Sequence, residues 1–264
     1  MTRGPWGAGR RAAIVGAGLA GMLWAVTLQA AGFPAGERLQ FNLHWMGIPA
    51  GTAVFETQAP APESYRIDVR LVSTGPVRLF FDVQDTMSSQ GRVNANGQLQ
   101  VVEHLLDQRE GDREKLQRYR FDPVAGQVHR QVDDGPWESH PMVASVLSDP
   151  LTVVYALRDL TLWHPGETVP VAFVSGDKQY HGHITLGRPK RLFTPIGGFE
   201  AAPVEVVLDN SKSYNKPGKL KVWFSLDELR LPLRVDAEIK VGTVYADLVG
   251  FSDSQGRVMT LRDR

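Results

Sequence analysis

The chain of 264 residues contains no cysteine. This absence excludes disulfide bonds, thiol nucleophiles, cysteine-ligated zinc and iron–sulfur clusters. It also excludes a lipid-modified cysteine after an export signal. A protein of this length can fold without disulfides, because the chain is long enough to bury a sizeable core.

The sequence also lacks an excess of positive charge and, after its N-terminal region, a long apolar run. Lys and Arg together number 29, as do Asp and Glu, so the formal net charge is zero. Such a balance offers little positive charge to neutralise phosphates, and we expect no nucleic-acid partner. The lack of a later apolar run of spanning length predicts no membrane span beyond the N-terminal region.

A glycine pattern near the N-terminus has two incompatible interpretations. Gly16, Gly18 and Gly21 match the G-x-G-x-x-G pattern that cradles a dinucleotide pyrophosphate. A dinucleotide site also needs a second buried strand that ends in an acidic residue about 20 residues further on. Pro34 and Gly36 stand where that strand would run, and both residue types weaken a central strand. We therefore reject the three glycines as a cofactor site and expect no cofactor.

The same region has the three parts of an export signal. Three arginines and no acidic residue precede an apolar run over residues 12–26, and residues 30–32 are small, as a cleavage site requires. We predict a cleaved signal peptide over residues 1–32 and a location in the periplasm of a Gram-negative bacterium. A retained membrane anchor is the alternative. The Arg10-Arg11 pair leaves the twin-arginine route open beside the general one.

The rest of the chain is dominated by alternation of apolar and polar residues, which predicts strands with one buried face. The clearest alternating sets lie at residues 41–45, 65–71, 220–226 and 231–241. Further strands are predicted near 51–58, 78–92, 99–108, 115–122, 127–132, 168–174, 178–187, 191–196 and 203–208. Gly197-Gly198 is among the turns predicted to separate them. We expect a mainly β protein whose antiparallel, curved sheet forms a barrel or half-barrel. Residues 37–252 would form this single domain and residues 253–264 a C-terminal tail.

One segment departs from the alternation. Asp149 and Pro150 provide a capping residue followed by proline at the first helical position, and apolar residues then recur at helical spacing. We predict one helix near 149–160, either covering an open barrel end or simply packed on a sheet. The segment 47–51 is predicted to be a hairpin turn, with contact to a ligand as the sharper alternative.

Several segments together resemble a known bacterial family. The strand–turn–strand sequence at residues 36–56, the helix at 149–158 and the ending at 221–225, 230–235 and 239–242 are similar to the family catalogued as domain of unknown function 3108. These matches span nearly the whole chain after the predicted signal. The resemblance implies an exported, β-rich protein and supplies no catalytic residues.

Two sets of side chains are candidates for binding. His181 and His183 lie two apart on one face of a predicted strand and are weak candidates for metal ligands, with ordinary solvent-facing histidines as the alternative. A set of apolar aromatic residues would either line a ligand cavity or form plain core: Trp45, Phe80, Phe81, Trp163, Phe173, Trp223 and Phe224.

These observations favour an exported, non-enzymatic binding or envelope-maintenance protein. Its partner would be a lipid or other apolar or amphiphilic ligand held in a β-barrel, or another envelope protein. The first alternative is a structural or interaction protein with a filled barrel. The second is an enzyme, either a hydrolase without a recognisable motif or a dinucleotide enzyme that uses Gly16, Gly18 and Gly21.

Overall fold

The computed structural model describes residues 33–79, 82–158, 164–209, 220–238 and 242–261. The chain divides into two units, residues 1–30 and 31–264, and all described residues lie in the second. The predicted signal over 1–32, with its glycines at 16, 18 and 21, lies outside the described residues. The candidates Phe80, Phe81 and Trp163 lie outside them as well.

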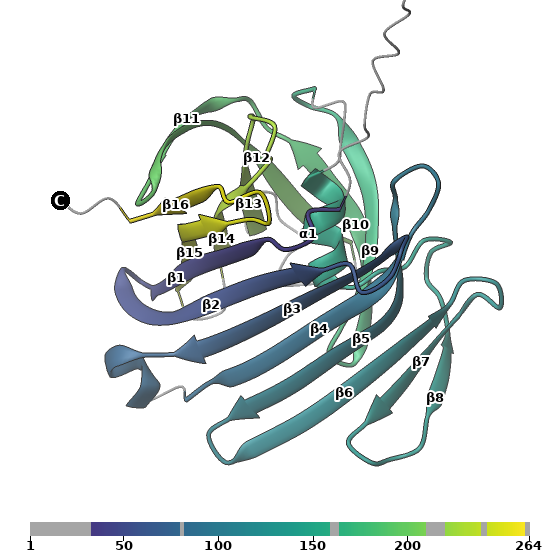
Figure 1. Ribbon diagram of the computed structural model, residues 1–264. Helices are drawn as coiled ribbons and strands as arrows, with labels where there is room; N and C mark the ends of the chain where they lie inside the picture. The colour runs from purple at the N-terminus through teal and green to yellow at the C-terminus, as the bar shows by residue number, and fades with distance from the viewer. Residues whose placement is uncertain (1–32, 80–81, 159–163, 210–219, 239–241, 262–264) are drawn as a thin grey trace, which may run out of the picture. The chain divides into compact units, whose positions relative to one another are not determined.

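The described residues form a sixteen-stranded antiparallel sheet with one α-helix and one 3₁₀-helix (Figure 1). The strands are β1 (Arg38–Trp45), β2 (Ile48–Gln58), β3 (Ser64–Ser73), β4 (Gln84–Val93), β5 (Leu99–Glu110), β6 (Arg113–Asp122), β7 (Gln127–Val132), β8 (Glu138–Pro141), β9 (Thr168–Ser175), β10 (Lys178–Leu186), β11 (Lys190–Thr194), β12 (Gly197–Leu208), β13 (Leu220–Ser225), β14 (Pro232–Glu238), β15 (Thr243–Ser252) and β16 (Val258–Thr260). The helices are η1 (Gly75–Leu79) and α1 (Pro150–Arg158).

The strands follow the order β8-β7-β6-β5-β4-β3-β2-β1-β15-β14-β13-β12-β10-β9, with β11 paired to β12 and β16 to β15. Most neighbours are joined by hairpins, and β1 pairs with β15 near the middle. The sheet is not closed, since its two end strands, β8 and β9, do not pair with each other in the described part of the chain. The predicted mainly β, antiparallel architecture with one helix is therefore confirmed.

Several predicted boundaries were wrong for local reasons. The strand predicted from residue 78 begins at Gln84, because residues 75–79 form η1 instead. The turn predicted at 47–51 consists only of Met46 and Gly47, both with positive φ, and β2 begins at Ile48. Positive φ at both central positions defines the tight hairpin turn that suits the twist of paired strands.

The C-terminal half contains more strand than the pattern predicts. Gly197 and Gly198, predicted to be a turn, begin β12, and the turn is made by residues 195–196. Residues 258–260 of the predicted tail form β16, which pairs with the end of β15. Neither β8, β15 nor β16 was predicted, since their short or glycine-containing stretches lack clear alternation.

Helix α1 occupies the concave side of the curved sheet (Figure 1). It packs on β4 and β5 from one half of the sheet and on β9 from the other. Its Leu151 and Tyr155 belong to an apolar cluster with β3, whereas Leu157 belongs to a cluster with β10, β12 and β13. Among the described residues, no helix is long and apolar enough to cross a membrane.

A buried ion pair fixes the C-terminal end of α1. The Arg158 guanidinium donates to both carboxylate oxygens of Glu37, at 2.6 and 2.7 Å, and to the Leu229 carbonyl at 2.8 Å. The Tyr155 hydroxyl donates to the same carboxylate at 3.2 Å. Both charged side chains are buried, so removal of either partner would leave an uncompensated charge in the interior.

Replacement of the buried carboxylate therefore provides a test of the fold. Glu37→Gln should lower the free energy of unfolding by about 3–5 kcal/mol, because Arg158 would stay buried without its counter-ion. Urea denaturation measures the change. Glu56→Gln is the matched control, since Glu56 pairs with Arg38 on the surface and should cost no more than about 1 kcal/mol. Equal losses in the two variants would contradict the assigned role of the buried pair.

Candidate functional site

The two ends of the open sheet meet along a seam closed by side chains. One apolar cluster joins β5, β6 and β7 to β9 across it, and contains Val101, Tyr119, Phe121, Val128, Leu147, Ala172 and Val174. The outer edge of β9 is partly occupied by Ser148, whose amide donates to the Ala172 carbonyl at 3.0 Å and whose carbonyl accepts from the Val174 amide at 2.9 Å. The segment that leads into α1 thus covers an edge that β8 does not reach.

Two polar contacts reinforce this seam. The Gln179 side chain of β10 accepts from the Val143 amide at 3.0 Å and donates to the Pro141 carbonyl at 2.9 Å. The Tyr119 hydroxyl of β6 donates to the Gly176 carbonyl in the β9–β10 turn. The side-chain amide of Gln179 therefore supplies hydrogen bonds between the two sheet ends, where no further described strand provides them.

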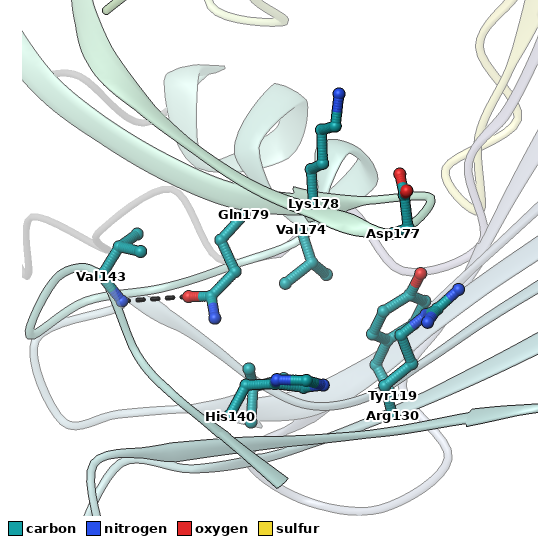
Figure 2. Close-up of a pocket in the computed structure, with 9 residues that line it drawn as sticks. Tyr119, Arg130, His140, Val143, Val174, Asp177, Lys178 and Gln179 are labelled. Atoms are coloured by element: carbon teal, nitrogen blue, oxygen red, sulfur yellow. Dashed lines mark hydrogen bonds between the residues drawn. The ribbon is translucent and has the colours of Figure 1, made fainter. Parts of the chain in front are cut away.

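A pocket of about 340 Å³ lies at this seam (Figure 2). Its walls come from β6, β7, the segment around β8 and the β9–β10 hairpin, and its lining residues are Tyr119, Val128, Arg130, His140, Val143, Val174, Asp177, Lys178 and Gln179. Three valines give it apolar wall surface. Ligand pockets typically combine such surface with a few placed polar groups and have volumes of about 300–1,000 Å³.

Arg130 and Lys178 are the arginine and lysine that line this pocket. Figure 2 shows the Lys178 ammonium and the Asp177 carboxylate pointing away from the space bordered by His140 and Gln179. The Arg130 guanidinium donates to the Gln117 side chain at 3.0 Å, and its Nη1 lies 3.8 Å from the Glu138 carboxylate. Its buried Nε has no hydrogen-bond partner among the described residues. Burial raises the pKa of the neighbouring Tyr119, while Arg130 opposes that rise.

A second polar group is fully buried at the N-terminal end of α1. Asp149 accepts from the backbone amides of Leu151 and Thr152, at 2.9 and 3.1 Å, as a helix-capping residue does. Its carboxylate also accepts from the Thr152 hydroxyl at 2.6 Å and from Ser89 Oγ at 2.5 Å. His104 lies beside them, with Nδ1 3.0 Å from Ser89 Oγ and 3.1 Å from the Ser88 carbonyl.

This Ser89–His104–Asp149 group is not arranged as a hydrolase triad. A carbonyl can only accept, so His104 carries its proton on Nδ1 and donates it. Both the serine and the carboxylate lie at this same nitrogen, whereas a triad places them on opposite ring nitrogens so that the second nitrogen can accept the serine proton. All three residues are also buried. The group therefore fixes α1 to β4 and β5.

The histidines proposed as weak metal ligands lie on β10 and are not among the residues that line the seam pocket. His181 Nδ1 lies 3.5 Å from the Asp209 carboxylate, and about half of each side chain is exposed. Within the part of the chain that the structure describes, no group of three histidine, aspartate or glutamate side chains is placed to hold a metal ion.

The described members of the aromatic set belong mainly to the core. Trp223 is buried and donates from Nε1 to Asp236 at 2.9 Å, with the Lys190 ammonium 4.4 Å from its ring centre. Phe224 is fully buried, and Phe173 packs on the same cluster. Trp45 ends β1. None of these four residues lines the seam pocket. Sequence reasoning missed the pocket, since its residues come from four separate segments with no shared motif.

The fold and its seam define a β-barrel-like protein with an open sheet and an internal helix. The model of the family described as protein of unknown function (DUF3108) matches residues 40–249, and the chain belongs to this family. The predicted resemblance is thereby confirmed. The comparison with curated proteins gives no match.

Two solved structures show similarity to this chain. The crystal structure of a β-barrel-like protein of domain of unknown function DUF1849 from Brucella abortus has a TM-score of 0.56 and 11% identity, over 83% of this chain and 98% of that chain. A DUF1089 family protein from Pseudomonas aeruginosa has a TM-score of 0.37 and 13% identity, over 75% of this chain and 93% of that chain. The first similarity supports the barrel-like fold alone.

The buried histidine predicts a pH dependence of stability. Burial lowers the pKa of His104, opposed by the charge of Asp149 and by the Ser88 carbonyl. The unfolded chain takes up a proton near pH 6.5 that the folded protein does not. The free energy of unfolding should therefore fall as pH drops below about 6.5, by at most ~1.4 kcal/mol per pH unit, until the folded pKa is reached.

Urea denaturation between neutral and mildly acidic pH measures this slope. His104→Gln should give a shallower slope than the unsubstituted protein, because its side chain does not titrate. His181→Gln, at a half-exposed position, should leave the slope unchanged. A slope that is identical in the two variants would contradict a depressed pKa at His104.

Proposed function

We propose that this protein is a non-enzymatic binding protein of the bacterial envelope that holds an apolar or amphiphilic ligand at the seam of its open sheet. The observation that carries the proposal is the seam pocket, with its valine surface, one lining arginine and a volume of about 340 Å³. A pocket between two unpaired sheet ends can widen without breaking a strand ladder, and only a few polar contacts hold its walls together.

The N-terminal pattern supports the envelope location. Residues 1–32 have the basic start, apolar middle and small residues of an export signal. Export would leave the described sheet in the periplasm, where amphiphiles from the adjacent membranes are available. The proposal places no chemistry on the buried Ser89–His104–Asp149 group.

A second candidate is a structural or interaction protein with a filled interior. It is favoured by the packing of α1 against both halves of the sheet, which fills the space that a central ligand would need. Under this proposal the exposed end strand β8 would pair with an extended segment of a partner.

Binding of a neutral fluorescent probe, phenylnaphthylamine, separates these candidates. The first candidate predicts saturable binding that Val143→Trp weakens by about tenfold or more, since an indole at this half-exposed position would fill the pocket entrance. Val146→Trp is the matched control, because Val146 is more exposed, lies in the same segment and does not line the pocket. Its affinity should stay unchanged.

Two results would argue against the first candidate. Failure of the unsubstituted protein to bind the probe saturably would leave the pocket without an apolar occupant. An equal loss of affinity in both tryptophan variants would place the binding site elsewhere.

The export proposal has its own measurement. Native mass spectrometry of the full-length protein produced in a Gram-negative host should show a mature chain shorter by about 30 residues, the length of a cleaved signal. The same spectrum reports any co-purified amphiphile. A full-length mass in the soluble cytoplasmic fraction would overturn the proposal of export.

A further inference from the structure

We propose that the seam pocket selects amphiphiles with an anionic headgroup, a carboxylate or a phosphate, and that Arg130 is the residue that recognises it. This inference rests on the proposed binding function and deepens it. It assigns the two ends of the ligand: the chain to the valine surface and the headgroup to the guanidinium.

Arg130 is incompletely paired within the protein. A guanidinium has five N–H donors and matches the geometry of carboxylate and phosphate oxygens. In the described structure Arg130 interacts with two neutral groups, the Gln117 side-chain oxygen and the Tyr119 hydroxyl, and its buried Nε has no partner. The nearest carboxylate, Glu138, lies 3.8 Å away, beyond hydrogen-bond distance, and its side chain is 56% exposed. The positive charge is therefore only partly compensated by the protein.

The charge of Arg130 is held in a sheltered position. Its side chain is 16% exposed, so an anion that reaches it is partly shielded from water and interacts more strongly than at the surface. The other charged lining residues, Asp177 and Lys178, point away from the pocket (Figure 2). Arg130 is therefore the cation nearest the Tyr119 end of the pocket, although the charge of Asp177 also acts on Tyr119.

Neutral groups surround Arg130 at this end of the pocket. The Tyr119 hydroxyl and the Arg130 guanidinium lie together on one side of the pocket, while Gln179, Val143 and Val174 border the rest (Figure 2). Tyr119 stays protonated because burial raises its pKa, and its proton is donated to the Gly176 carbonyl. An anionic headgroup would thus meet the guanidinium as its donor at this end, and its chain would lie along Val128, Val143 and Val174.

Four ligands with the same alkyl chain test this assignment by isothermal titration calorimetry: decanoate, decyl phosphate, decanol and decyltrimethylammonium. The purified protein should bind decanoate or decyl phosphate more tightly than decanol, and the ammonium compound most weakly. The tighter of the two anions identifies the carboxylate or the phosphate as the preferred headgroup.

Substitution of Arg130 separates headgroup recognition from chain binding. Arg130→Gln should lower the affinity for the preferred anion by about tenfold to a hundredfold, the effect of losing a charge-assisted hydrogen bond, and should leave decanol within about twofold. Arg130→Lys, which keeps the charge, should retain part of the preference. Arg120→Gln is the matched control, since this arginine on β6 is exposed, pairs with Glu103 and does not line the pocket.

The outcomes distinguish this inference from the function on which it rests. Equal binding of decanol and both anions, unaltered in Arg130→Gln, would overturn anion selection while leaving the binding function intact. A preference for the ammonium compound would also overturn it. Failure of all four ligands to bind the unsubstituted protein would overturn both. Thermal unfolding of each variant verifies that a lost affinity does not reflect a lost fold.

Discussion

The junction at Ser148 and Asp149 is the constraint on which the rest of this structure depends. Ser148 pairs with the outer edge of β9, and the next residue caps α1 while its carboxylate accepts from Ser89 on β4. Two adjacent residues therefore connect the end strand β9 to β4 in the other half of the sheet, with which β9 forms no ladder. At the other end of α1, the Arg158–Glu37 pair fixes the helix to the start of β1. Both ends of the helix are thus held to the sheet by buried polar contacts.

This arrangement bears on where the proposed ligand would bind. In the described part of the chain, α1 packs against apolar clusters of both sheet halves, and a pocket remains at the seam. There the walls meet through side chains such as Tyr119 and Gln179, and a pocket remains between them. The proposed amphiphile would place its headgroup at Arg130 and its chain on the three valines of this pocket.

Much of the fold could be predicted from the sequence, because alternation of apolar and polar residues indicates a strand with one buried face. Residues 65–71 and 231–238 are examples, and Asp149-Pro150 marks the helix start through its capping chemistry. The short edge strand β8 could not be predicted, since all four of its residues are exposed and its pattern carries no alternation. The pocket could not be predicted from the sequence either. Arg130 and Gln179 are far apart in sequence and become neighbours only because the two sheet ends meet. Phe224, by contrast, was a candidate for lining a ligand cavity and lies in the core.

The central claim is that an amphiphile occupies the seam rather than the interior beside α1. Methyl-resolved NMR during titration with decanoate tests it most directly, because valine and leucine methyl groups line both regions. The account predicts that the largest shifts occur at Val128, Val143 and Val174, with smaller changes at Leu151 and Leu157. The largest shifts at the two leucines of α1, with the three valines unperturbed, would contradict it.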